Sequence, residues 1–244
     1  MKQLTIIAAL LAWPAPACPQ ETKPAAAETV QVSSIKDPAL RPYRQMVRGL
    51  DAWEEKRALA PNASLRFEMI TADGKPVAPG GLQLRIAGDK VDIALPIDTD
   101  SSFVLPRSQE AWDDRADLLL NRKKDQFRWR PRVRTPGVPD NARRLGDLRL
   151  ECEVSAAVRK EEMPLLMRAG ALATGGLCNL PMTGYVYRAP KRLASVSVVS
   201  GERRSRLFML AGGEGFHAPL RDKSWDDEAL VVYEFADAPE TAGP

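Results

Sequence analysis

Histidine, cysteine and aromatic residues are scarce in this chain of 244 residues, which has one histidine, three cysteines and 6% aromatic residues. A single histidine and the lack of a Cys-x-x-Cys motif give no reason to expect a zinc site. The sequence also lacks a nucleophile elbow, a Walker loop and a Gly-x-Gly-x-x-Gly fingerprint. We therefore expect no metal, no cofactor, and neither serine nor cysteine hydrolase chemistry.

No sign of charge predominates either. The chain has 35 lysines and arginines against 32 aspartates and glutamates, which gives a net charge of +3. With so small an excess there is no global attraction to nucleic acid, so a site for anions has to be a local cluster. Hydrophobic residues make up 44% of the chain, which is enough to build a packed core.

Long hydrophobic runs are missing as well, and no segment is long enough to span a membrane. The apolar stretch 4–13 follows Lys2 and precedes small residues around Ala17, which is the pattern of a cleaved export signal. We expect a signal peptide at residues 1–17 and a protein exported to the periplasm or the cell envelope.

Cleavage after Ala17 makes Cys18 the first residue, the position at which bacterial lipoproteins carry their lipid. Cys18 is therefore a candidate lipidation site that would anchor the protein at the envelope. Otherwise it is a spare thiol, or it is removed by cleavage one residue later. Residues 18–34 are rich in proline and alanine without apolar periodicity, so we expect a disordered tether there. A disordered C-terminal tail is expected at residues 238–244.

What the sequence does contain is a repeat of part of itself. Residues 82–121 match residues 195–234 without gaps at a constant offset of 113. The identical pairs that keep this spacing are Gly88/Gly201, Phe103/Phe216, Pro106/Pro219, Trp112/Trp225, Asp113/Asp226, Asp114/Asp227 and Ala116/Ala229. Such a match predicts two copies of one supersecondary unit. The expected structural anchors of the two copies are Phe103, Phe216, Trp112 and Trp225.

The residues in and around the repeat have the pattern of short strands. From Leu65 apolar and polar residues alternate, and turn signals such as Gly88-Asp89 recur between the alternating segments. This is typical of a β-sandwich or a small barrel. We therefore expect a mainly β protein with two tandem β-sandwich modules, residues 62–140 and 141–237. The alternating residues 148–152 are expected to form the first strand of the second module.

Two helices are expected beside the strands. The first spans residues 35–61, with Asp37 as its N-cap and Pro38 at its first position. Its apolar stripe consists of Leu40, Tyr43, Val47, Leu50 and Trp53. We expect this stripe to pack on a sheet, because the mixed charge of the other face argues against a helix on a membrane surface. The second helix lies in an insert of the second module, residues 157–180.

Cys152 and Cys178 are the two cysteines outside the N-terminal region. Two cysteines in an exported chain predict one disulfide. The bond would staple the insert to the strand at residues 148–152. Because this structural role accounts for both cysteines, no redox activity is expected of them.

The pattern Gly-Asp, Ile-Pro, Asp and Phe-x-Leu-Pro in residues 88–106 resembles modules of the transthyretin-like and carboxypeptidase-regulatory-like β-sandwich type. The whole chain, with Asn121-Arg-Lys-Lys and the segment Arg144–Cys152, resembles a family of exported proteobacterial proteins. The resemblance implies a β-sandwich fold and export. It implies no activity and no catalytic residue.

The best candidate for a binding site is a row of arginines at every second position. Arg128, Arg130, Arg132 and Arg134 alternate with apolar residues, so an extended strand would point all four to one side, about 7 Å apart. Arg122, Lys123 and Lys124 precede the row. The row either binds an anion, or it protects an edge strand from pairing with other molecules while forming ion pairs with nearby acids.

Several carboxylates also have suggestive spacing. Asp98, Asp100 and Ser102 place an oxygen at every second position, as in a calcium loop. The second copy has Ala211, Gly213 and Gly215 there, which favours a turn in both copies. Asp113-Asp114 and Asp226-Asp227 are adjacent pairs of the kind found in acid–base sites. Their recurrence after a tryptophan in both copies favours an architectural role.

These observations lead to one main function hypothesis and two alternatives. The main hypothesis is a non-catalytic, exported protein that acts in binding or envelope assembly, with an anionic polysaccharide, a lipid headgroup or an envelope protein as partner. The first alternative is a carboxylate-based hydrolase acting on cell-wall or polysaccharide substrate. The second is a structural or secretion-accessory subunit of a larger complex. Nucleic acid is disfavoured as a partner.

Overall fold

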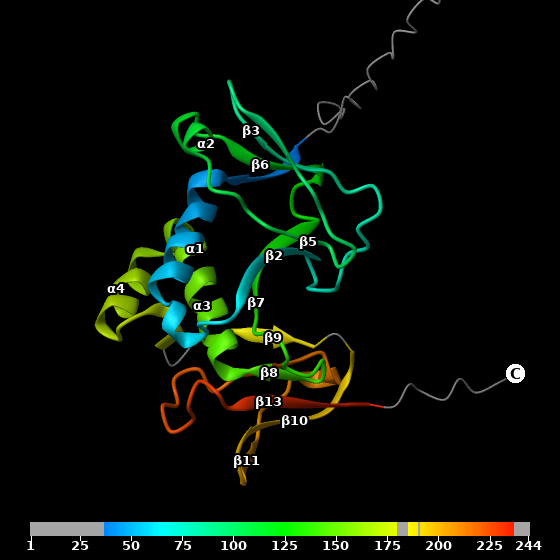
Figure 1. Cartoon of the computed structure of the whole chain (residues 1–244), viewed down its shortest axis with the longest axis vertical. Helices are drawn as coiled ribbons and strands as arrows, with labels where there is room; N and C mark the ends of the chain where they lie inside the picture. The colour runs from blue at the N-terminus through cyan, green and yellow to red at the C-terminus, as the bar shows by residue number, and fades with distance from the viewer. Residues whose placement is uncertain (1–36, 180–184, 190, 237–244) are drawn as a thin grey trace, which may run out of the picture. The chain divides into compact units, whose positions relative to one another are not determined.

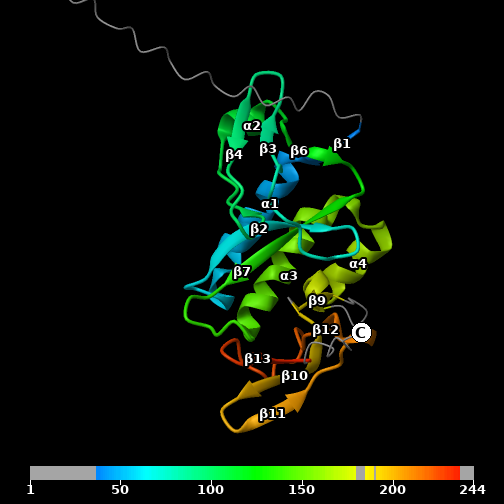
Figure 2. The same cartoon turned by 90° about the vertical axis from the view of Figure 1, so that its right-hand side faces the viewer.

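The computed structural model describes residues 37–179, 185–189 and 191–236 (Figures 1 and 2). The expected signal peptide, tether, Cys18 and C-terminal tail lie outside these ranges. Within them, no helix combines the length and the apolar character that crossing a bilayer requires.

The protein is mainly β, as predicted, with several antiparallel sheets and few helices. The strands are β1 Pro38–Pro42, β2 Ser64–Thr71, β3 Leu84–Ala87, β4 Asp92–Leu95, β5 Ser102–Phe103, β6 Asp117–Lys123, β7 Phe127–Arg134, β8 Ala142–Arg144, β9 Val186–Arg188, β10 Leu193–Ser200, β11 Arg203–Arg206, β12 Gly215–His217 and β13 Leu230–Phe235. The α-helices are α1 Tyr43–Glu55, α2 Gln109–Asp113, α3 Leu145–Arg159 and α4 Leu165–Ala173.

Two four-stranded sheets have the orders β1-β6-β3-β4 and β8-β13-β10-β11. In each sheet a hairpin, β3–β4 or β10–β11, pairs through its first strand with β6 or β13. The strand on the other side of β6 or β13 leads directly into a helix, α1 after β1 and α3 after β8. The first residue of each helix donates its N–H to the carbonyl oxygen of the residue before β6 or β13. Tyr43 donates to Ala116 at 2.9 Å, and Leu145 donates to Ala229 at 2.7 Å.

Two smaller sheets have the orders β5-β2-β7 and β12-β9. Phe103 of β5 lies opposite Phe67 of β2, with ring centroids 5.9 Å apart. Phe216 of β12 lies opposite Tyr187 of β9, with ring centroids 5.7 Å apart. Phe103 and Phe216 are both fully buried, so each anchors a core as expected.

The pairing registers correct the gap-free alignment by one residue. Ile86 lies opposite Leu118 and Val198 lies opposite Val231, so Ile86 corresponds to Val198 and not to Val199. Ile86 and Val198 are fully buried, whereas Val199 is not. A slip of one residue moves every side chain of a strand to the other face, so burial identifies the true correspondence. The extra residue of the second segment lies between β11 and β12.

The first helix starts later than the sequence predicts. Residues 38–42 form β1, which pairs with β6, and α1 begins at Tyr43. Pairing with a neighbouring strand therefore overrides the local helix-start signal of Asp37 and Pro38. Tyr43 and Val47 of the predicted stripe are buried in the core, but Leu40 is exposed.

The prediction of a strand at residues 148–152 is wrong, because these residues lie in α3. Leu148 and Cys152 belong to a core with β9, β10, β12 and β13, whereas Leu150 and Val154 belong to the core around α1 and β2–β6. Leu148 and Leu150 point to opposite sides of the helix, because two residues correspond to a rotation of about 200° around the helix axis. A helix buried between two cores thus imitates the alternation of a strand.

The predicted disulfide is present and joins Cys152 of α3 to Cys178. It closes a segment that contains a 3-10 helix, Lys160–Glu162, and α4. Two ion pairs connect the same segment to β1 and α1: Arg41 of β1 to Glu162 and Arg48 of α1 to Glu161, each at 2.5 Å. The helix expected in the insert is therefore observed, held by one covalent and two ionic links.

Reduction of the disulfide is expected to loosen residues 160–179 before the sheets. The bond closes this segment alone, and α4 buries no residue of its own. Amide hydrogen exchange before and after reduction measures the effect. An equal loss of protection in β3, β6, β10 and β13 would show that the bond stabilises the whole fold instead.

Candidate functional site

A pocket of about 490 Å³ lies where the ends of β2 and β7 meet α3, the start of α4 and β9. One part of its wall is apolar or aromatic: Ile70, Trp129, Met163, Pro164, Met167, Leu177 and Tyr185. Burial raises the pKa of Tyr185 to about 12, so its hydroxyl stays protonated at neutral pH. This part of the wall therefore combines apolar side chains with Tyr185, whose hydroxyl is protonated.

The other part of the wall carries four arginines, Arg128, Arg130, Arg159 and Arg188. Arg130 is bound to Glu68, and Arg188 to Glu214 at 3.0 Å. Arg128 and Arg159 are exposed, and neither has an ion pair or a side-chain hydrogen bond within the described ranges. Two guanidinium groups of this pocket are thus free to bind an anion.

The acids of the pocket wall, Asp73 and Glu162, already have cationic partners. Asp73 accepts a hydrogen bond from Thr71 and lies 2.9 Å from Lys75, which together lower the pKa of Asp73 to about 2. Glu162 binds Arg41. Because a general acid needs a raised pKa, the ionised Asp73 is unsuited to that role, and this arrangement does not favour the hydrolase alternative.

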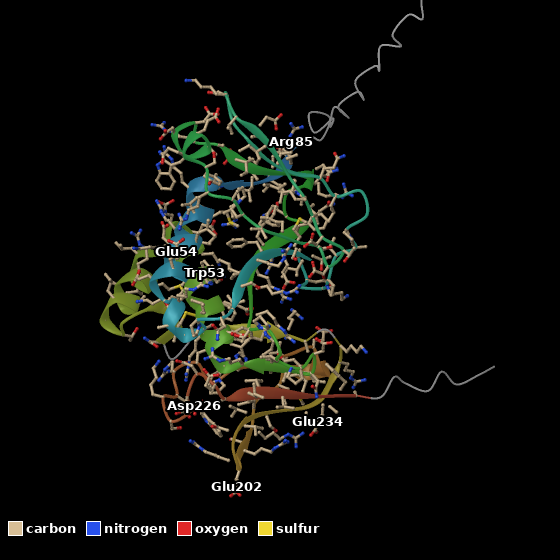
Figure 3. The ribbon with its side chains drawn as sticks, in the orientation of Figure 1. Trp53, Glu54, Arg85, Glu202, Asp226 and Glu234 are labelled. Atoms are coloured by element: carbon tan, nitrogen blue, oxygen red, sulfur yellow. A yellow bond between two sulfur atoms is a disulfide. The ribbon has the colours of Figure 1, made fainter. Side chains whose placement is uncertain are left out.

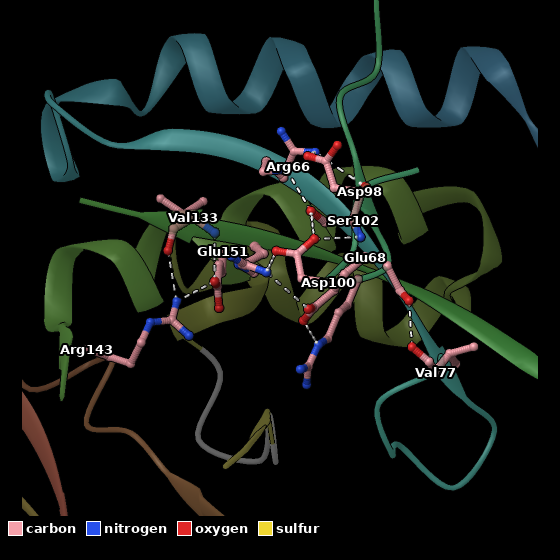
Figure 4. Close-up of polar contacts among 12 residues, drawn as sticks. Arg66, Glu68, Val77, Asp98, Asp100, Ser102, Val133, Arg143 and Glu151 are labelled. Carbon is pink, nitrogen blue, oxygen red and sulfur yellow. Dashed lines mark hydrogen bonds and ion pairs between the residues drawn. The ribbon is translucent and has the colours of Figure 1, made fainter. Parts of the chain in front are cut away.

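The four arginines of the predicted row have different roles: two bind only structural partners, and two line the pocket. Arg132 binds Asp100 at 2.6 Å, and Arg134 donates to the carbonyl oxygens of residues 138, 139 and 142. Only Arg128 and Arg130 reach the pocket. Figure 4 shows the network around β2 and β7 that contains Glu68 and Asp100, the partners of Arg130 and Arg132. The ion pairs agree with the edge-strand interpretation for Arg130 and Arg132, and Arg128 is the member left for a ligand.

The open edge of β7 is covered by side chains rather than by another strand. Val133 donates its N–H to Glu151 at 2.7 Å and accepts from Arg143 at 2.9 Å (Figure 4). Burial alone would lower the pKa of Arg143, but the Glu151 carboxylate beside it raises it, so Arg143 stays charged. Pro131, which lacks an N–H, leaves no donor to satisfy at its position.

Arg122, Lys123 and Lys124 are not brought to the pocket. They lie at and just after the end of β6, and none of them is part of the pocket wall. Arg122 donates to the carbonyl of its neighbour Asn121 at 2.7 Å. The basic cluster that precedes the arginine row in the sequence therefore does not contribute to the pocket wall.

The spaced carboxylates have structural partners. Asp98 binds Arg66, and Asp100 accepts from Ser102 and Arg132. Asp114 accepts the N–H groups of residues 90 and 91 in the β3–β4 turn, and Asp227 binds Arg149 at 2.5 Å. Among the described residues no group of three or more His, Cys, Asp or Glu is arranged to hold a metal ion.

The two tryptophan anchors differ in burial. Trp225 is buried beneath Arg203, whose guanidinium carbon lies 3.8 Å from the ring centroid. Trp112 is only partly buried, with Arg44 5.1 Å from its ring centroid. Both rings are thus covered by an arginine rather than enclosed by apolar residues alone.

Asp100 is expected to make stability depend on acid pH. Burial raises its pKa, but hydrogen bonds from Ser102 and Arg132 outweigh this and lower it from the usual 3.8 to about 2. A carboxyl whose pKa is lower in the folded state stabilises the fold above pH 3.8 and loses this effect as the pH falls to 2. The stability difference between wild type and Asp100→Asn should therefore shrink over that range.

Urea unfolding of both proteins at several pH values measures this difference. Glu202→Gln is the matched control, because it removes a carboxylate at the exposed tip of the β10–β11 hairpin (Figure 3). A difference for Asp100→Asn that stays constant from pH 5 to pH 2 would contradict the assignment.

Several residues of the pocket were not singled out from the sequence. Arg159 ends α3, Arg188 ends β9, and Met163 and Met167 belong to the disulfide-linked segment. They lie 25 to 60 positions from the arginine row, and only the fold brings them together. Comparisons with family models, with curated proteins and with solved structures found no match.

Proposed function

We propose that this is an exported, non-catalytic binding protein whose ligand is an anion with an apolar part, held in the pocket between β7, α3 and α4. The observation that carries the proposal is that one pocket contains both kinds of group. Arg128 and Arg159 have no ionic partners in the described ranges, and the same pocket has an apolar wall that includes Met163, Met167 and Trp129. Neither the two arginines nor the apolar wall alone specifies such a ligand, but together they match an anionic head and a hydrocarbon tail.

The chemistry of the arginines favours a carboxylate or phosphate head. A guanidinium presents parallel N–H donors that match these groups, and such charge-assisted bonds are stronger than neutral ones. The apolar wall favours a hydrocarbon chain over a polysaccharide, whose hydroxyl groups would find few partners there. A lipid-like anion is therefore the partner that the pocket suits best, among those the sequence suggests.

Location at the envelope agrees with such a ligand. The export pattern at residues 1–17 and the candidate lipidation site Cys18 would place the protein where lipid-like anions are found. A binding role in envelope assembly follows from that placement.

We also propose that the chain consists of two copies of one sandwich-like unit. The support is that β1, α1, β2, β3, β4, β5 and β6 have counterparts in β8, α3, β9, β10, β11, β12 and β13 with the same pairings. In this proposal each unit includes its strand and helix, so the first starts near Pro38 and the second near Ala142. The segment with α4, which has no counterpart in the first unit, supplies Met163, Pro164, Met167 and Leu177 to the apolar wall of the pocket.

The ligand class is tested by titrating the full chain with three probes, decyl phosphate, decyl glucoside and inorganic phosphate. Trp129 in the pocket wall provides a fluorescence signal. Decyl phosphate, below its micelle concentration, is expected to bind most tightly because it engages both halves of the pocket. Equal affinity for decyl glucoside, or no binding of any probe, would contradict the proposal.

A further inference from the structure

The outer face of α4 is apolar, which is unusual for a short helix on a protein surface. Leu165, Leu166 and Leu172 expose 78%, 84% and 85% of their surface, and no residue of α4 is buried. Leu165, Ala169 and Leu172 follow helical spacing and so form one continuous stripe. An exposed apolar patch of this kind marks a surface that another phase or molecule covers.

The fold holds this helix in place despite its exposed leucines. A helix of nine residues is marginal on its own, so its position depends on its links to the rest of the protein. These links are the disulfide Cys152–Cys178 and the two ion pairs, one to β1 and one to α1. α4 lies beside α1 and α3 in Figure 1.

The charges around the stripe are positive. α4 contains Arg168, which is exposed, and no acidic residue. Arg159 and Lys160 precede the helix and are also exposed. The acids nearest to α4 in the sequence, Glu161 and Glu162, are bound to Arg48 of α1 and Arg41 of β1. Leucines flanked by cations are the features of helices that lie in the interface of an anionic membrane.

We propose that α4 docks the protein on an anionic membrane surface, with its leucines in the acyl boundary and its cations at the lipid phosphates. A second copy of the chain is a poorer occupant. A helix of nine residues is about 14 Å long and about 10 Å across, so its outer face falls well short of the roughly 800 Å² per partner of a stable interface. The proposal goes beyond ligand binding in the pocket, and neither depends on the other.

A spin label at Ala173→Cys tests the docking locally. Ala173 is exposed at the end of α4, and Cys18→Ser in the same chain leaves no other free thiol. With vesicles of phosphatidylcholine and phosphatidylglycerol, we expect the label's accessibility to oxygen, relative to a water-soluble nickel chelate, to rise several-fold. A label at Ser205→Cys on the exposed strand β11 should stay in water. A label at residue 173 that stays in water overturns the proposal.

Matched variants separate the leucine stripe from general hydrophobicity. The triple change Leu165→Gln, Leu166→Gln and Leu172→Gln should abolish the response of the label at residue 173. Phe208→Gln removes an exposed apolar side chain just after β11 and should leave the response of the label intact. Self-association through α4 without vesicles, seen as a doubled mass by sedimentation, would identify a second copy as the occupant and overturn the proposal. Probe binding in the pocket is measured without vesicles, so failure of one idea is distinguishable from failure of the other.

Discussion

Replacing Arg149 with methionine is expected to lower the free energy of unfolding by about 3–5 kcal/mol, because the change breaks a buried ion pair and its hydrogen bonds. Arg149 is buried in α3, and all three nitrogens of its guanidinium have partners. It donates to the carbonyl oxygens of Leu220, Asp222 and Trp225 and to the carboxylate of Asp227. These acceptors belong to the loop between β12 and β13.

The loss is large because methionine fills the space but satisfies none of these acceptors. Arg149→Lys keeps the charge but not the fork of donors, so its effect should be intermediate. Arg204→Met, on the exposed strand β11, is the control and should change stability by about 0.5 kcal/mol or less. Urea unfolding of the three variants makes the comparison. A loss for Arg149→Met no larger than that of the control would show that the loop is held by other contacts.

The sequence predicts much of the β-structure because strand patterns are local. Alternation and turn signals identify the hairpin β3–β4 correctly, and two cysteines in an exported chain predict the bond between Cys152 and Cys178. The identity of α3 could not be predicted in the same way. Its alternation at Leu148 and Leu150 arises from two cores on opposite sides, which is a property of the whole fold.

The pocket could be predicted only in part for a related reason. Arg128 belongs to a row of arginines that is recognisable in the sequence. Whether its guanidinium lacks an ionic partner, however, depends on which arginines of the row form ion pairs in the fold. Glu68 and Asp100, which bind Arg130 and Arg132, come from β2 and from the segment before β5. Nothing in the spacing of a single segment reveals such partners, and the same holds for Arg159 and the methionines that complete the site.

The double change Arg128→Gln and Arg159→Gln is expected to weaken binding of decyl phosphate by about 100-fold or more. Each arginine is assigned a charge-assisted hydrogen bond worth about 1.5–3 kcal/mol, and about 1.4 kcal/mol corresponds to tenfold in affinity. Stability should be almost unchanged, because both side chains are exposed and have no ionic partner in the described ranges. The effect should therefore appear in binding and not in unfolding.

The most direct test of the binding site is calorimetric titration of decyl phosphate into three proteins: wild type, the Arg128→Gln/Arg159→Gln variant, and an Arg204→Gln/Arg206→Gln control. The control removes the same charge from the exposed strand β11, away from the pocket wall. We predict that the pocket variant loses about 100-fold or more in affinity, as expected for two lost charge-assisted bonds, while the control stays close to wild type. Equal affinities for the pocket variant and the wild type, or equal losses in both variants, would contradict the assignment of the pocket as an anion site.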